Sequence, residues 1–396
     1  MSQRRPEVAD VLREHGPEYA RTRGSAMSRQ SHRALTDLAR CRTAALGGHK
    51  RCCDHCGHEE ISYNSCRNRH CPKCQALARA RWLEQEAAHL LEVPYFHVVF
   101  TLPAELGPLV LQNRRPLYGA LFQTAAQTLT TLARDPAHLG AEIGFLMVLH
   151  TWGQNLCHHP HVHCVVPAGG ISPDGQRWIA CRKDFFLPVR VLSRLFRGKF
   201  LDRLERLHAA GKLTLAGSLC SLQEPQHWQD LMRSLRQTEW VVYCKRPFGG
   251  PRQVLKYLAR YTHRVAIANS RILSMLDGKV RFRWKDYAHA GKQRVMQLDA
   301  GEFIRRFLLH ILPKGFVRIR HYGFLSNRSR TGRLALARAL LARSPAPQAT
   351  TVTEMAPTLA DGEPRCPCCK KGRLLIVERF GPLQPDSPTP GYLDTS

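Results

Sequence analysis

The sequence of 396 residues contains no apolar run that approaches the roughly 18 residues needed to cross a membrane. Its charged N-terminus also lacks the apolar core of a secretion signal. Acidic residues are scarce, because 31 Asp and Glu stand against 59 Lys and Arg, which gives a net charge of +28. These absences indicate a cytoplasmic protein without a membrane partner. The excess of positive charge favours a polyanionic partner, usually a nucleic acid.

The pattern of strands and helices predicts an α+β protein with several parts. Four parts are expected: a basic N-terminal segment (1–30), a cysteine-rich domain (31–80), a larger domain of strands and helices with a basic C-terminal part (81–343), and a linker, short cysteine module and tail (344–396). Apolar runs bounded by turn residues predict strands at 95–102, 144–152, 161–166 and 240–245. Amphipathic patterns predict helices at 81–93, 189–211, 252–264 and 302–312. Residues 271–275 and 280–287 read as a hairpin turned by Asp277-Gly278.

Several of the 15 cysteines fall in CxxC pairs, which is typical of zinc sites and not of disulfides. The strongest pattern lies between residues 41 and 74, where Cys53-x2-Cys56 and Cys71-x2-Cys74 are separated by 14 residues. Zinc prefers four tetrahedral ligands, and two CxxC turns supply four thiolates. The spacing therefore predicts one structural Zn²⁺ bound by Cys53, Cys56, Cys71 and Cys74.

Other potential ligands surround this pattern. Four of them could form a second, interleaved zinc site: Cys41, His49, Cys66 and His70. The two histidines could equally lie on the surface or face DNA. Cys366, Cys368 and Cys369 near the C-terminus provide only half a site, and the sequence does not indicate its missing ligands. Arg67 and Arg69, beside the CxxC turn, suit contacts to phosphate.

A pair of histidines in HHPHVHCVVPAGG (158–170) predicts a second kind of metal site. His161 and His163 flank one apolar residue, so an extended strand would direct both imidazoles to the same face. Two neutral imidazoles at this spacing can bind one divalent metal. Most such pairs are structural, but the cationic chain and the neighbouring histidines favour a metal here. His150 is the first candidate for a third ligand and Gln154 the second.

A pair of tyrosines follows in LKYLARYTHR, where Tyr257 and Tyr261 would share one face of a helix. Such pairs often pack in a core, but three cations interleave with these two: Lys256, Arg260 and Arg264. Cations near a phenol lower its pKa and bind phosphate. A metal-binding histidine pair and a tyrosine pair together are suited to cutting a DNA strand by attack of tyrosine on phosphate.

Three motifs resemble those of the rolling-circle transposases of the insertion-sequence-ninety-one type. In chain order they are SCRNRHCPKCQ, LHTWGQNLCHHPHVHCVVPAGG and YLARYTHRVA, which is also their order in the family. The resemblance covers about residues 30–330. It implies a zinc-binding domain followed by an HUH (His-hydrophobic-His) nuclease with a central antiparallel sheet flanked by helices.

The resemblance also implies roles for individual residues. His161 and His163 correspond to the HUH histidines, and Tyr257 and Tyr261 to the tyrosines that hold a 5′-phosphate. The implied activity is cleavage and rejoining of single-stranded or hairpin DNA at the ends of a mobile element, with Mg²⁺ or Mn²⁺ as the catalytic metal. Residues 314–343 carry eight Lys or Arg and no acid, so they are expected to contact DNA, through Arg318, Arg320, Arg328 and Arg330.

Two other functions are compatible with parts of this pattern. An HUH replication initiator or relaxase shares the histidines and tyrosines, but the zinc cluster and the order of the motifs disfavour it. A zinc-dependent DNA-binding regulator without catalysis would explain the charge and the cysteines, but not the histidine and tyrosine pairs. The motifs together favour a transposase.

Overall fold

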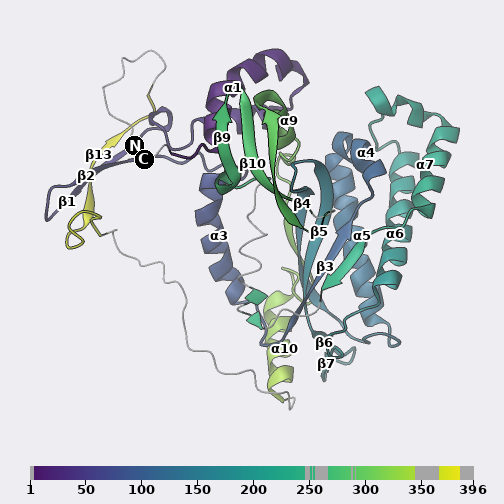
Figure 1. The fold of residues 1–396 in the computed structure, drawn as a ribbon. Coiled ribbons are helices and arrows are strands. Elements are labelled where there is room, and N and C mark those ends of the chain that lie inside the picture. The colour runs from purple at the N-terminus through teal and green to yellow at the C-terminus, as the bar shows by residue number, and fades with distance from the viewer. Residues whose placement is uncertain are drawn as a thin grey trace.

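A computed structural model describes most of the chain (Figure 1). The described residues are 4–245, 250–251, 253–254, 266–286, 289, 291–343 and 365–383, and for residues 76–78 the backbone alone is described. Within these ranges, no helix is long and apolar enough to span a membrane.

A five-stranded sheet forms the centre of the molecule (Figure 1). Its strand order is β12-β4-β5-β3-β8, and every neighbouring pair is antiparallel. The strands are β3 (Tyr95–Thr101), β4 (Gly144–Trp152), β5 (His158–Pro167), β8 (Val242–Lys245) and β12 (Ile319–Gly323). The structure thus confirms an α+β fold with a central antiparallel sheet, and β12 is a strand that the sequence analysis did not predict.

One face of the sheet packs against a layer of helices. This layer contains α4 (Gly107–Gln112), α5 (Arg114–Arg134), α6 (Val189–Ala209) and α7 (Pro225–Gln237). Alternate residues of β3 and β5 enter this core, among them Phe100 and Val162, which are fully buried with Phe196 of α6. The period of two in these strands therefore separates one apolar face from the face that carries the histidines.

The opposite face is covered in part by two other helices, α3 (Pro72–Ala87) and α10 (Arg330–Arg343). Val148 of β4 and Val165 of β5 pack there in a second cluster with Leu334 of α10. At the edge of this cover, His321 of β12 contacts Glu86 of α3 (3.1 Å). The same face of the sheet carries polar side chains, among them His163, which lies opposite Val148.

The N-terminal helices pack with a β-hairpin from the later part of the chain. Together they enclose a third cluster of buried apolar residues. The elements that contribute to this cluster are α1 (Val8–Arg23), α2 (Arg29–Ala39), β9 (Ile272–Leu276), β10 (Lys279–Asp286) and α9 (Ala300–Leu308). β11 (Lys292–Asp299) pairs with β10 and completes a three-stranded sheet. The predicted turn is confirmed, because Asp277 and Gly278 have φ values of 50° and 67°. Two successive residues with positive φ form the type of turn that joins tightly paired strands.

The remaining strands form two small sheets. β1 (Gly48–Cys53) lies between β2 (Glu59–Tyr63) and β13 (Leu374–Phe380), and β6 (Gly169–Ile171) pairs with β7 (Trp178–Ala180). Short 3₁₀ turns connect several elements: Gly24–Ala26, Ala44–Leu46, Ala104–Leu106, Gly217–Gln223 and Asn269–Arg271. The first small sheet joins segments from the two ends of the sequence.

The contact between Gly144, at the start of β4, and Phe324 allows a test of the packing of the central sheet. A methyl group added at Gly144 would lie 2.6 Å from a ring carbon of the fully buried Phe324. We expect Gly144→Ala to lower the free energy of unfolding by about 1–3 kcal/mol, because the ring cannot move without disturbing the core. Urea denaturation measures the change.

The matched control is Gly119→Ala in α5, where no atom would lie within 4 Å of the new carbon. Alanine is favoured over glycine in a helix by about 1 kcal/mol, so this variant should be as stable as the parent or more stable. Equal stability of the two variants would contradict the packing described for Gly144.

Candidate functional site

Three histidines lie together on the face of the central sheet opposite the layer of α4, α5, α6 and α7. His161 and His163 of β5 point to the same side, and the register of β4 places His150 directly opposite His161. The ring centroids of His150 lie 5.4 Å from His161 and 4.3 Å from His163. One ring nitrogen from each of the three histidines lies within 4.8 Å of the others, so the group could hold a metal ion.

Neighbouring groups orient each ring. Nδ1–H of His161 donates to the carbonyl of His159 (2.7 Å), which directs its Nε2 away from the backbone. His163 Nδ1 is hydrogen-bonded to His97 Nε2 (2.8 Å), and His150 stacks on Trp152 with 4.5 Å between ring centroids. Such partners fix the ring and tautomer of metal-binding histidines in other proteins.

The histidines are held in the form that binds metal. Burial lowers the pKa of His161 from its usual value of 6.5 to about 4. Burial also lowers the pKa of His163 well below that value, and the neighbouring His150 and His161 act in the same direction. Both rings are therefore neutral near pH 7, and a neutral imidazole offers a lone pair to a divalent cation. The donor set and its burial fit a metal.

His97 is part of this site and was missed by the sequence analysis. It lies on β3 and is 5% exposed, and its ring stacks on His163 at 5.1 Å between centroids. The run YFHVVFTL was interpreted only as a buried strand. A single imidazole within an otherwise apolar strand is the signal that could have identified it, because a buried polar group needs a partner.

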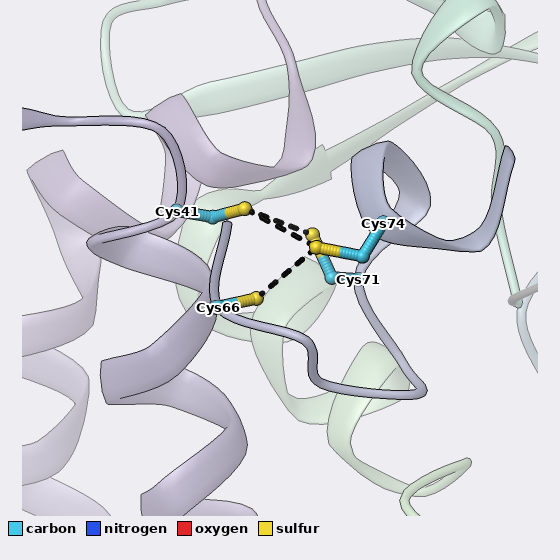
Figure 2. A group of neighbouring side chains, drawn as sticks. All are labelled: Cys41, Cys66, Cys71 and Cys74. Carbon is cyan, nitrogen blue, oxygen red and sulfur yellow. Dashed lines mark hydrogen bonds between the residues drawn. The ribbon is translucent and has the colours of Figure 1, made fainter. Parts of the chain in front are cut away.

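A group of four cysteines lies between α2 and the start of α3 (Figure 2). Cys41 lies 3.5 Å from both Cys71 and Cys74, and Cys66 lies 3.6 Å from Cys74, measured between sulfur atoms. A zinc–sulfur distance of about 2.3 Å places the four sulfurs of a tetrahedral site roughly 3.8 Å apart. The group therefore has the size of a zinc site.

The predicted grouping of the cysteines is corrected by this geometry. Cys71 and Cys74 join Cys41 and Cys66, whereas Cys53 and Cys56 lie with Cys366 and Cys369 of the C-terminal segment. The spacing along the chain gave the CxxC pairs but not their partners, because β1 and β2 carry Cys53 and Cys56 away from Cys71.

The two histidines of the predicted interleaved site belong to neither group. Nε2 of His70 accepts a hydrogen bond from the backbone N–H of Leu312 (3.1 Å), and its Nδ1 contacts Asn68. His49 lies on β1 opposite Ser62 of β2. His70 thus packs the cysteine loop against the segment after α9.

The arginines predicted to bind DNA fall into two classes. Arg69 donates to the backbone carbonyls of Pro313 and Phe316, Arg318 donates to Gln75, and Arg320 lies 4.2 Å from the centre of the Phe122 ring. These three guanidinium groups therefore make contacts within the protein. Arg67 and Arg328 are exposed and Arg330 is half-buried at the start of α10.

The two predicted nucleophiles, Tyr257 and Tyr261, lie outside the described residues, as do Lys256, Arg260 and Arg264. The structure does describe residues on either side of them. Gln154, the alternative third ligand, lies in the turn between β4 and β5.

Comparison with known proteins places the chain in a family. Residues 144–332 match the family model described as "Putative transposase", and residues 11–102 match the one described as "Transposase zinc-binding domain". "Putative transposase y4qJ" from Sinorhizobium fredii (strain NBRC 101917 / NGR234) is 54% identical over 96% of this chain and 97% of its own length. The chain belongs to the transposases of the insertion-sequence-ninety-one type.

A more distant relative supports the same family. "Transposase for insertion sequence element IS801" from Pseudomonas savastanoi pv. phaseolicola is 32% identical over 74% of this chain and 70% of its own length. No solved structure matches the chain. The comparisons confirm the family that the three sequence motifs indicated.

Two histidines outside the groups of potential metal ligands, the half-buried His158 and the buried His310, are expected to make the stability of this transposase depend on pH. Burial lowers the pKa of His158 to about 3 and that of His310 to about 4. Both values lie below 6.5, so below that pH the unfolded chain binds more protons and stability falls. Between about pH 7.5 and about pH 5.5 each histidine should cost about 1.4 kcal/mol.

Urea denaturation of the parent and of His310→Gln across this range measures the loss. His310 contacts Thr151 and the carbonyl of Leu156, and a Gln amide can replace these hydrogen bonds without titrating. The variant should lose about 1.4 kcal/mol less than the parent, while His227→Gln at an exposed position should follow the parent. Identical pH curves for His310→Gln and the parent would show that this histidine does not titrate as described.

Proposed function

We propose that this transposase cuts and rejoins single-stranded DNA through a 5′-phosphotyrosine, in rolling-circle transposition. The observation that carries the proposal is the group of three histidines on one face of the antiparallel sheet. Such a group can hold a divalent cation beside a phosphate. Tyr257 or Tyr261 would supply the nucleophile.

The described residues around the tyrosine segment support this assignment. Val254, three residues before Tyr257, is fully buried in the cluster with Val148 and Val165 on the histidine face. Ala266, five residues after Tyr261, borders a cavity lined by Thr151 and Trp152, next to His150 in the sequence. Both described ends of the segment therefore adjoin the strands that carry the three histidines.

The proposed cleavage step is a transfer of one phosphate ester. The tyrosine oxygen forms a bond to phosphorus while the bond from phosphorus to the 3′ oxygen breaks. The phenolic proton is lost and the leaving oxygen gains one, so the products are a 5′-phosphotyrosine and a free 3′-hydroxyl. Because the ester bond is conserved, a later 3′-hydroxyl can reverse the step and join strands without ATP.

The three histidines would hold the catalytic cation, for which we propose Mg²⁺ or Mn²⁺. When bound, the cation supplies positive charge to the phosphate oxygens as the ester bond exchanges. Mg²⁺ loses its water ligands reluctantly and binds oxygen, whereas Mn²⁺, a transition metal, accepts nitrogen ligands more readily, so Mn²⁺ should support cleavage at the lower concentration. The four thiolates of Cys41, Cys66, Cys71 and Cys74 would hold a structural Zn²⁺.

The charge of the chain suits a DNA substrate in the cytoplasm. A net charge of +28 attracts phosphates, and Arg67 and Arg328 are exposed to contact them. Attack by tyrosine requires a strand free of its complement, so single-stranded DNA and hairpins at element ends are the proposed substrates. Arg330 adds a cation beside Arg328, whereas Arg69, Arg318 and Arg320 would act mainly within the protein.

A covalent adduct tests the function directly. With Mn²⁺ and a single-stranded oligonucleotide that carries the element end, the protein should form a 5′-phosphotyrosyl peptide containing Tyr257 or Tyr261, detected by mass spectrometry after trypsin digestion. The Tyr257→Phe, Tyr261→Phe double variant should form none. The same sequence as a blunt duplex should react far less, because its strands are paired.

Tyr243 provides the matched control, because it is a half-exposed phenol near the histidines that is not an assigned nucleophile. It lies on β8 opposite Val99 of β3, and Val99 lies opposite His163 of β5. Tyr243→Phe should form the adduct as the parent does. An adduct on Tyr243, or cleavage by the double variant at the parental rate, would refute the assigned nucleophiles.

Variants of the histidines test the catalytic metal separately. His161→Ala with His163→Ala should reduce cleavage by at least about 10²-fold, because the cation loses two ligands. DNA binding in a fluorescence-anisotropy titration and the zinc content of the chain should stay near parental values. His138→Ala, in the turn before β4, should cleave normally, and unchanged cleavage by the double variant would exclude the proposed site.

A further inference from the structure

The C-terminal cysteine segment folds against the N-terminal one. β13 pairs with β1 in antiparallel register from Gly48 opposite Phe380 to Cys53 opposite Leu374. This pairing brings the short module at 365–383 beside residues more than three hundred positions earlier, and β1 becomes the central strand of its sheet. A contact that stabilises this pairing must join residues near position 50 to residues near position 370.

Four sulfur atoms meet at the end of this sheet. The sulfur of Cys53 lies 3.7 Å from that of Cys369, and the sulfur of Cys56 lies 3.7 Å from that of Cys366. These separations match the roughly 3.8 Å expected between thiolates around tetrahedral zinc. We propose a second structural zinc ion bound by four thiolates: Cys53, Cys56, Cys366 and Cys369.

The two CxxC turns have the same backbone form. The carbonyl of Cys53 accepts from the N–H of Gly57 (3.1 Å), and the carbonyl of Cys366 accepts from the N–H of Lys370 (2.9 Å). Gly57 and Lys370 both have positive φ, at 69° and 58°. Each turn therefore directs its two sulfurs to one side, and the two turns face each other as the two halves of one site.

Backbone amides also approach the sulfurs. The N–H of His55 lies 3.4 Å from the sulfur of Cys53, and the N–H of Gly372 lies 3.4 Å from that of Cys369. Amides donated to sulfur stabilise the thiolate, which is the form that binds metal. A residue larger than glycine would not fit at 372, because its Cβ would lie 2.5 Å from the sulfur of Cys53.

The hydrophobic core of this module is too small to hold it without a metal. Its buried cluster contains only Cys53, Cys366 and Leu374, while Ile376 and Val377 of β13 are exposed. Modules of this size usually depend on a metal or disulfides, because so few apolar side chains cannot offset the entropy of folding. The four cysteines form no disulfide. Zinc would supply the missing stabilisation.

The site extends beyond the zinc-binding domain recognised by family comparison. That match covers residues 11–102, so it contains Cys53 and Cys56 but neither C-terminal ligand. The inference does not depend on the proposed DNA cleavage. It implies that the domain matched at residues 11–102 of this chain is completed by residues 366–369.

Zinc content of the full chain tests the proposal. After gel filtration, elemental mass spectrometry should find two zinc ions per parental chain and one in the Cys366→Ser, Cys369→Ser double variant. Cys368→Ser is the matched control in the same turn, because Cys368 is exposed and outside the group, and it should keep two ions. Cys52→Ser is the corresponding control on β1.

A second variant separates loss of a ligand from loss of the fold. Cys369→His retains a four-ligand site, so it should keep two zinc ions and, loaded with Co²⁺, should show a weaker thiolate charge-transfer band than the parent. One zinc ion in the parent, or an unchanged content in the Cys366→Ser, Cys369→Ser variant, would overturn the proposal. Loss of both ions from that variant would also overturn it, since the two sites would then not be separate.

Discussion

The pairing of β4 with β5 is the constraint on which the candidate site depends. Its register places His150 opposite His161, while Leu149 and Val162, also opposite each other, turn to the core beneath. A slip of one residue would move the histidines into that core and the apolar residues out of it. The hydrophobic contact of one face therefore fixes the position of the histidines on the other, and His97 of β3 adds a hydrogen bond that orients His163.

Much of the central sheet could be predicted because its pattern is local. The run 144–152 coincides with β4. The alternation of residues around Val162 correctly predicted that the imidazoles of His161 and His163 lie on one face of the sheet. The sequence also identified His150 as a candidate third ligand, and the structure brings it into the group. The short strand β12 was missed because its residues are interspersed with cations, which were interpreted as a surface for DNA.

The cysteines and arginines show what a linear pattern cannot determine. A CxxC spacing identifies a turn with two ligands, but the choice of partner turn depends on strand pairing between distant segments, here β1 with β13. Similarly, a count of positive charges does not distinguish Arg328, which is exposed, from Arg69, which binds two backbone carbonyls. The predicted domain boundaries at residues 30, 80 and 343 remain predictions.

The three groups of potential metal ligands found among the described residues close chain loops of very different length. The histidine group joins neighbouring strands, the group in Figure 2 spans 33 positions from Cys41 to Cys74, and the other cysteine group spans 316 positions from Cys53 to Cys369. Closure entropy grows with the logarithm of loop length, so the longest closure costs only about 2 kcal/mol more than the intermediate one. A single structural zinc contributes roughly 10 kcal/mol or more in small domains, which is ample to offset that difference. Metal binding can thus hold two segments that are distant in the sequence, β1 and β13, together where hydrophobic burial is insufficient.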